Sequence, residues 1–302
     1  MLPKRSMPWG VWLSLLVILL LGLTGLFAPV IAPYDPTQMQ IGRSHLPPAW
    51  YDSPGKPGRP EHLLGTDLYG RDIFSHVIHG ARAGMFLVLT AMPLAVLIGL
   101  VVGIAAGFGQ RWLEPALLRL MDVMSAVPAF MFAVILILIL RATPTGTVFG
   151  GLITVTLAFA LINWVSLAKL VHVSVLQLRS QVFMEAARSL GAGTWHQTVR
   201  HVLPHLLNLI LVWVINNIPA VILLEALMGY VGIQILQVND GTGFQDLSWG
   251  GLILLGRTQI NRNPFILFAP TLCVLLISMS FATLGEYLQE RLHARRNDTS
   301  LL

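Results

Sequence analysis

The sequence predicts an all-α polytopic membrane protein with six transmembrane helices. Hydrophobic residues make up 55% of the 302 residues and charged residues only 11%, whereas a soluble domain carries about a quarter charged residues. The mean hydropathy is +0.72, and the apolar residues gather in long runs separated by polar segments. The net charge of +5 does not indicate nucleic-acid binding, because no basic cluster with interleaved aromatic residues occurs.

Each of the apolar runs approaches or exceeds the roughly 20 residues that a helix needs to cross a bilayer. The expected spans are residues 11–32, 84–109, 115–140, 148–169, 203–229 and 265–288. The first run follows Lys4 and Arg5 and exceeds the roughly 7–15 apolar residues of a signal peptide. We therefore expect it to be retained as a span, with the N-terminus inside.

Residues 33–83 are rich in proline and glycine and contain no long apolar run. This composition predicts an exterior segment of irregular structure. Asp67, Arg71 and Asp72 stand near its end, where we expect them to pair locally and to fix the start of the second span. Contact with substrate is a second interpretation of these charged residues.

Glycine recurs every four residues along the second span, at Gly99, Gly103 and Gly107. Residues at this spacing lie on one helix face. Small residues on one face allow two helix backbones to approach closely in lipid. The pattern predicts a tight helix–helix contact.

The third and fourth spans each contain polar or helix-breaking residues. Pro128 should bend the third span, because proline interrupts helical hydrogen bonding. Arg119 and Asp122 are three residues apart and are expected to pair at the membrane edge. Asn163 in the fourth span is expected to hydrogen-bond between helices.

Residues 185–204 are the longest amphiphilic interruption in the apolar second half of the chain. The first residues favour a helix, which Gly191 should end in a left-handed turn. Thr194 and Gln197 have the spacing of a capping box, so a second helix should begin there. Pro204 is tolerated at a helix start. This elbow suits docking of a partner, and an ordinary interfacial loop fits the same residues equally well.

The fifth span is the most polar of the six. Its polar and helix-breaking residues are Asn208, Asn216, Asn217, Pro219 and Glu225. Polar groups in hydrocarbon are costly and normally face the bundle interior or a water-filled path. We therefore predict that Asn216 and Asn217, near mid-membrane, line a translocation path. Glu225 falls near the outer end, where it either pairs with an arginine of a neighbouring helix or lines the same path.

Several kinds of chemistry have no motif in this sequence. No Gly-x-x-x-x-Gly-Lys-[Ser/Thr] phosphate loop occurs, so the chain is not expected to be an enzyme or to hydrolyse ATP. The single cysteine, Cys273, excludes an internal disulfide. No metal site is expected either, because the histidines near the elbow have no acidic or thiol ligand among them; these are His196, His201 and His205.

The distribution of basic residues predicts the orientation of the chain. With the N-terminus inside, the interior segments carry a clear excess of Lys and Arg over Asp and Glu, whereas the exterior segments are nearly balanced. This distribution follows the positive-inside rule. Both termini and the elbow are therefore expected in the cytoplasm.

The elbow resembles the EAA loop of bacterial ABC importer permeases. The matching residues, at the spacing of that family, are Glu185, Ala186, Ala187, Gly191, Leu203 and Pro204. His201 departs from the pattern, because many of these permeases carry isoleucine there. In that family the loop is a coupling helix that docks into a cleft on the cytoplasmic ATPase subunit, so the resemblance implies an ATPase-coupling role for the matching residues.

Two further stretches resemble signatures of the dipeptide, oligopeptide and nickel permeases. Residues 64–72 read Leu-Gly-Thr-Asp-Leu-Tyr-Gly-Arg-Asp and resemble the Leu-Gly-Thr-Asp-x-x-Gly-Arg-Asp signature before the second span in that subfamily. Ser248-Trp249-Gly250 resembles a later signature. The connection 234–247 before it is longer than the family pattern suggests.

The resemblance also implies a division of the chain. A MetI-like permease core of five helices would occupy residues 84–290, with one extra N-terminal helix within residues 1–32. The other expected parts are an exterior segment at 33–83, the coupling loop at about 179–204, an exterior loop at 230–264 and a cytoplasmic tail at 291–302.

The implied function is that of a permease subunit of an ATP-driven importer in the bacterial inner membrane. It would form half of the path for short peptides delivered by an extracytoplasmic solute-binding protein. The implied partners are a second permease subunit, forming a heterodimer, and two ATPase subunits that bind ATP and Mg, while this chain needs no cofactor. Import of a nickel chelate, glutathione or another small solute stays open, as does a channel or scaffold not coupled to ATP.

Overall fold

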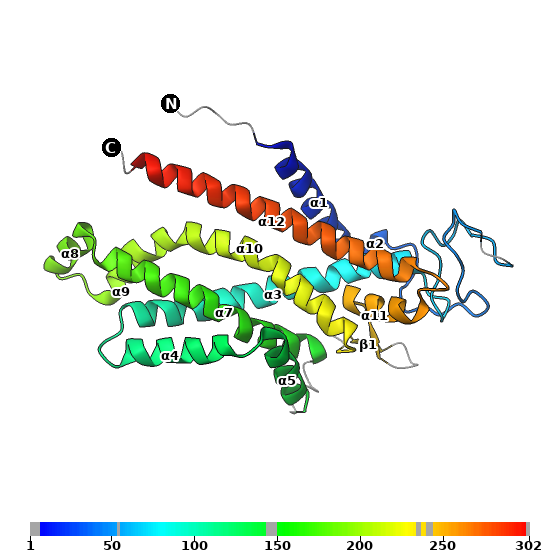
Figure 1. The fold of residues 1–302 in the computed structure, drawn as a ribbon, viewed down its shortest axis with the longest axis horizontal. Coiled ribbons are helices and arrows are strands. Elements are labelled where there is room, and N and C mark those ends of the chain that lie inside the picture. Colours follow the sequence, from blue (N-terminus) through cyan, green and yellow to red (C-terminus); the bar gives the residue numbers. More distant parts are fainter. Residues whose placement is uncertain (1–6, 53–54, 143–149, 234–236, 240–243, 300–302) are drawn as a thin grey trace.

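The computed structural model describes residues 7–52, 55–142, 150–233, 237–239 and 244–299. Figure 1 shows long helices arranged along one bundle, with α8 and α9 at one end and the segment that precedes α3 at the other. The elements are α1 (Trp9–Leu26), α2 (Ala28–Ile31), α3 (Ile73–Gly107), α4 (Leu113–Ala126), α5 (Ala129–Arg141), α7 (Gly150–Arg179), α8 (Val182–Ser189), α9 (Thr194–Gln197), the π-helical turn η1 (Thr198–Val202), α10 (Leu203–Tyr230), β1 (Gln237–Asn239), β2 (Phe244–Asp246), α11 (Trp249–Gln259) and α12 (Phe265–Thr299).

Five of the described helices are long and apolar enough to cross a membrane, and the pair α4 and α5 adds a sixth candidate. The two helices of this pair meet at 94° next to Pro128, which precedes α5. The bend predicted at this proline is confirmed, as a break between two helices. In Figure 1, α3 and α7 both end near α8, α4 runs back along the bundle away from that end, and α5 turns off the bundle axis.

Several helices extend beyond the apolar runs that predicted them. The helix expected from residue 84 begins at Ile73, because the Asp72 carboxylate caps it and accepts a hydrogen bond from the Ser75 amide at 2.8 Å. The fourth span continues to Arg179. The expected tail is helical as far as Thr299. Hydropathy marks where a helix leaves lipid, whereas helical hydrogen bonding continues into polar residues.

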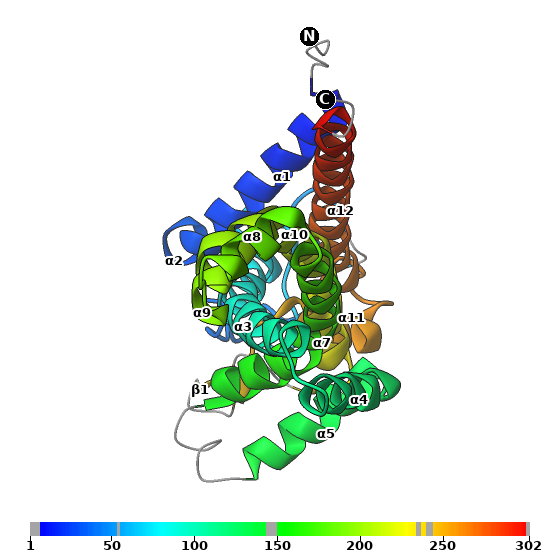
Figure 2. The same cartoon turned by 90° about the vertical axis from the view of Figure 1, so that its left-hand side faces the viewer.

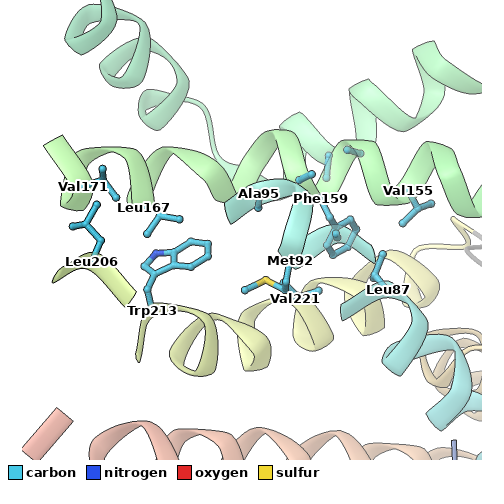
Figure 3. Close-up of a cluster of buried hydrophobic side chains, with 14 of the residues drawn as sticks. Leu87, Met92, Ala95, Val155, Phe159, Leu167, Val171, Leu206, Trp213 and Val221 are labelled. Carbon is cyan, nitrogen blue, oxygen red and sulfur yellow. The ribbon is translucent and has the colours of Figure 1, made fainter. Parts of the chain in front are cut away.

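The centre of the bundle is a contact between α3, α7 and α10. Figure 3 shows buried side chains from the three helices converging on one another, with Phe159 of α7 and Trp213 of α10 among them. Phe159 is completely excluded from solvent. Viewed along the bundle in Figure 2, α1 and α12 lie on one side of this centre, and α4 and α5 lie on the opposite side.

The glycines of α3 face α7 at very short range. A Cβ atom added at Gly99 would lie 3.0 Å from the Trp164 carbonyl oxygen, and one at Gly103 would lie 2.6 Å from the Ala168 carbonyl oxygen. At Gly107 an added Cβ would lie 2.5 Å from Val175. Any side chain here would force the two helices apart.

One predicted ion pair is wrong. Asp122 of α4 does not pair with Arg119, but accepts a hydrogen bond from the Lys169 ammonium group of α7 at 2.8 Å. Asn163 also behaves differently from its prediction, because its side-chain amide donates to the Phe159 carbonyl of its own helix at 2.9 Å.

The segment between α10 and α12 contains two strands and a helix that were not predicted from the sequence. β1 and β2 pair antiparallel, with Gln237 opposite Asp246, and part of the connection 234–247 lies outside the described residues. Trp249 begins α11 and donates from its indole nitrogen to the Val77 carbonyl of α3 at 2.9 Å. α11 therefore packs against α3 at the end of the bundle far from α8.

Candidate functional site

The elbow between α7 and α10 is a helix, a glycine turn and a second helix, as predicted. Gly191 has φ +84°, the left-handed conformation that glycine adopts without steric cost. Its amide donates to the Arg188 carbonyl at 2.9 Å, and the Ala192 amide donates to the Ala187 carbonyl at 3.0 Å. These two bonds form a Schellman motif, which satisfies the last carbonyls of α8.

The predicted capping box at the start of the second helix is wrong. Gly193 is the N-cap residue of α9, and no side chain caps that helix. Gln197 instead donates from its side-chain amide to the Ala192 carbonyl at 2.6 Å, and it is 4% exposed. The glutamine therefore braces the turn from within, a role that sequence spacing alone does not distinguish from capping.

The second helix of the elbow continues without interruption into a membrane span. α9, η1 and α10 form one helical run from Thr194 to Tyr230, and Pro204 lies in the first turn of α10. A single π-helical turn of this kind often occurs at functional sites. The elbow thus connects the end of α7 directly to the helix that carries the predicted path residues.

The elbow presents large apolar side chains to its surroundings. Val182 is 81% exposed, Leu190 is 89% exposed and Trp195 is 81% exposed. Glu185 and Ala186 are exposed beside them, whereas Met184 is fully buried. Large exposed apolar side chains are found at many interaction surfaces.

The imidazole rings of the elbow histidines pack against the Phe183 ring and against one another. The Phe183 ring on α8 lies 5.9 Å from those of both His201 and His205 and is stacked on the latter, while His196 lies 6.2 Å from His201. Within the described residues, no group of three or more His, Cys, Asp or Glu side chains is placed to hold a metal ion. These contacts fasten α8 to the start of α10.

A groove between α7, α10 and α12 contains the predicted path residues Asn216 and Asn217. Its volume is about 550 Å³. The lining residues are Leu170, His205, Asn208, Leu209, Val212, Trp213, Asn216, Asn217, Gln289 and Leu292. The groove therefore offers several side-chain amides.

Close packing positions both asparagines. A Cβ atom added at Gly285 of α12 would lie 1.9 Å from the Asn216 amide oxygen, so any side chain at Gly285 would displace this amide. Asn217 donates to the Trp213 carbonyl at 2.8 Å. The Trp213 indole donates to the Ser166 hydroxyl at 3.1 Å, which links the groove to α7.

Glu225 lies apart from this groove. It is 1% exposed and is not among the residues that line the groove. One turn further along α10, a Cβ atom added at Gly229 would lie 2.5 Å from Gly250 of α11. The structure therefore places Glu225 near the contact between α10 and α11 rather than beside Asn216.

The predicted exterior segment is irregular as far as Asp72, as expected, and buried polar contacts fix it. Arg71 pairs with Asp67 at 2.6 Å, so this predicted local pairing is confirmed. Asp72 pairs instead with His62 at 3.0 Å. Asn263, between α11 and α12, donates to the Leu46 carbonyl of the segment at 3.3 Å. Sequence spacing gives no signal for the last two contacts, because the partners are not periodic neighbours.

Comparison with known sequences gives matches over most of the chain. Residues 99–294 match the family described as binding-protein-dependent transport system inner membrane component. Residues 9–48 match the N-terminal TM domain of oligopeptide transport permease C.

Individual relatives are similar over nearly their whole length. The di/tripeptide transport system permease protein of Pseudomonas aeruginosa is 30% identical over 92% of this chain and 86% of its own. The oligopeptide transport system permease protein of Bacillus subtilis is 29% identical over 92% of this chain and 83% of its own. The glutathione transport system permease protein of Pectobacterium atrosepticum is 28% identical over 92% of this chain and 84% of its own.

Proposed function

This chain belongs to the inner-membrane permease components of binding-protein-dependent ABC importers, and from that premise we propose that it forms half of a translocation path for short peptides. The permease is a non-catalytic, multi-pass inner-membrane subunit of the peptide and oligopeptide family. Its partners include an ATPase and a binding protein. The ATPase, a separate subunit, carries out hydrolysis, and the permease holds no cofactor.

The assembly that we propose has a second permease subunit beside this chain and two ATPase subunits below it. The elbow docks on one ATPase through Glu185, Ala186 and Ala187. Gly191 supplies the turn, and Leu203 and Pro204 lead into α10. This arrangement places the elbow and both termini in the cytoplasm. The N-terminal end of α1 and the C-terminal end of α12 lie toward the elbow end of the bundle (Figure 1), which fits an even number of crossings.

One observation carries the coupling role. The elbow is a compact, turn-stabilised projection with Val182, Leu190 and Trp195 exposed, and it connects two membrane-spanning helices without flexible linkers. Exposed apolar side chains of this kind are typical of a surface that a partner covers. A shift of a docked ATPase would therefore act on α7 and α10 together.

The groove supports peptides as the substrate class. Asn208, Asn216, Asn217 and Gln289 offer amide donors and acceptors, which match the hydrogen-bonding groups of peptide bonds. The same amides also fit glutathione, which contains peptide bonds, and one of the relatives is a glutathione permease. A nickel chelate or another small solute is the alternative cargo for the same architecture.

Purification from membranes tests the coupling role. Wild type should copurify with ATPase subunits and a second permease, and Glu185→Lys should lose the ATPases while keeping the second permease. Glu290→Lys is the matched control, because Glu290 is an exposed glutamate on the part of α12 that follows Gly285. If no ATPase accompanies folded wild type, the coupling role fails, and an uncoupled channel or scaffold becomes the better interpretation.

A further inference from the structure

Arg179, the last residue of α7, contacts the C-terminal end of α3. Arg179 donates from its guanidinium to the Gly107 carbonyl at 2.5 Å, and the guanidinium carbon lies 5.6 Å from the centre of the Phe108 ring. The final carbonyls of a helix have no intrahelical partner, and a positive charge is favourable beside them. Arg179 therefore satisfies the C-terminus of α3 by hydrogen bond, charge and ring contact together.

Two more basic side chains of α7 reach α4. His172 lies 3.0 Å from the Glu114 carboxylate, and Lys169 lies 2.8 Å from the Asp122 carboxylate. Both partners belong to α4, which follows α3 in the chain. The half of α7 nearest the elbow is thus joined by polar contacts to α3 and to α4.

These contacts lie directly beside the elbow. α8 begins at Val182, three residues after Arg179, and the Arg188 guanidinium of α8 donates to the Arg179 carbonyl at 3.2 Å. The first helix of the elbow is therefore attached to α3, α4 and α7. The second helix is continuous with α10, which the Phe183 ring of α8 also contacts through His201 and His205.

We propose that Arg179 is a positioning residue that makes the first helix of the elbow and the end of α3 move as one unit. The inference rests on the proposed function, because it concerns how a displacement of the docked elbow reaches the spans. With Arg179 in place, movement of α8 carries the adjoining end of α3 with it. Without it, that end of α3 follows α8 less closely, and ATP is hydrolysed without transport.

Arginine suits this position better than lysine. A planar guanidinium can donate to the Gly107 carbonyl and lie over the Phe108 ring at the same time. A lysine ammonium retains the charge and one hydrogen bond. Arg179→Lys should therefore rescue part of the function that Arg179→Ala loses.

The test uses spin labels in the purified transporter with its ATPase partners. Labels on Gln110→Cys and Ser189→Cys, two exposed positions, report the distance between the end of α3 and the elbow in a Cys273→Ser background. In the otherwise unchanged protein, ATP with vanadate should alter this distance by less than about 2 Å. In Arg179→Ala the distance should change by about 5 Å or spread into a broad distribution.

A functional readout accompanies the distances. Vesicles that accumulate radiolabelled alanylalanine with the wild-type transporter should show an uptake per ATP hydrolysed about tenfold lower with Arg179→Ala. An intermediate value is expected for Arg179→Lys. Arg111→Ala removes an exposed arginine beyond the end of α3 and should leave the ratio unchanged.

Two outcomes would overturn the proposal: a nucleotide response of Arg179→Ala identical to wild type, or equal losses of uptake and hydrolysis, which indicate a merely structural role. Gly191→Pro, measured in parallel, distinguishes failure of the positioning role of Arg179 from failure of the coupling role of the elbow. If Gly191→Pro uncouples transport while Arg179→Ala does not, only the positioning role is wrong. If neither variant uncouples transport, the elbow is not the coupling element.

Discussion

The Nδ1 atom of His62 lies 3.0 Å from the Asp72 carboxylate, and the two side chains are 0% and 1% exposed. The Arg43 guanidinium lies 3.3 Å from the other ring nitrogen. Because a guanidinium can only donate, that nitrogen accepts, and Nδ1 carries the proton donated to Asp72. The same carboxylate caps α3 through the Ser75 amide, so one buried group contacts both the segment before α3 and the start of a membrane helix.

Replacing His62 should destabilise this end of the protein. His62→Ala leaves the Asp72 carboxylate buried without its imidazole donor, which costs about 1–3 kcal/mol. We expect a lower thermal unfolding midpoint in detergent and faster proteolysis of the exterior segment. Glu61→Gln changes the exposed neighbouring residue and should behave as wild type. Equal midpoints for His62→Ala and Glu61→Gln would show that the pair contributes nothing to stability.

The glycine face of α3 gives a prediction with an internal control. Gly103→Ala places a Cβ atom 2.6 Å from the Ala168 carbonyl oxygen, and relieving this overlap should cost about 1–3 kcal/mol. Gly84→Ala changes a glycine of the same helix whose added Cβ meets no atom within 4 Å. Unfolding of each variant in denaturing detergent should show a large loss for the first and little change for the second. A loss of similar size in both would mean that the close approach at Gly103 is not the cause, because alanine has the higher helix propensity and should not weaken a helix by itself.

The turn of the elbow should tolerate some substitutions and not others. Gly191→Pro cannot adopt φ +84°, because the proline ring fixes φ near −65°. The variant should insert in the membrane but hydrolyse ATP without importing peptide. Gly193→Ala, at φ −67° and with open space around its added Cβ, should transport normally. Uptake of a peptide per ATP hydrolysed distinguishes the two, and normal uptake by Gly191→Pro would refute the coupling role of the elbow.

The segment that contains His45, before α3, should loosen in mild acid. Burial lowers the pKa of His45 below its ordinary value of 6.5, and the Arg262 charge lowers that pKa further; the Arg262 guanidinium lies 3.1 Å from the ring. Between pH 6.5 and the lowered pKa, the unfolded chain binds a proton that the folded chain does not. Stability contributed by His45 is therefore complete above pH 6.5 and is lost as the pH falls through the lowered pKa.

Thermal unfolding midpoints at pH 7.5 and pH 5.5 measure this effect. The difference between them should be smaller in His45→Asn, because asparagine does not titrate and tolerates the positive φ of this residue. An unchanged difference in that variant would assign the acid sensitivity to other groups.

Local patterns predicted the elbow and the glycine face well. Gly191 occupies the left-handed turn expected of it, because the preference of glycine for this conformation depends only on its own backbone. Gly99, Gly103 and Gly107 face a helix, because four-residue spacing alone places them on one side of α3. The coupling role of the elbow is a separate matter and stays a prediction.

Predictions that required a partner were less successful. Asp122 was expected to pair with Arg119 and pairs with Lys169 of another helix. Gln197 was expected to complete a capping box and braces the turn through the Ala192 carbonyl. In each case two partners were chemically suitable, and the nearer one in sequence was not the nearer one in space.

The sequence by itself determined that the chain is an all-helical membrane protein, where most of its spans lie, and which residues form the elbow and the closely packed glycine face. These properties follow from hydropathy and spacing within single segments. Only the tertiary structure decided that Arg179 holds Gly107 and that His62 meets Asp72. It also decided that Asn216 lies against Gly285. Such contacts join positions that are not periodic neighbours, so they depend on how helices and loops cross in space, which no local pattern encodes.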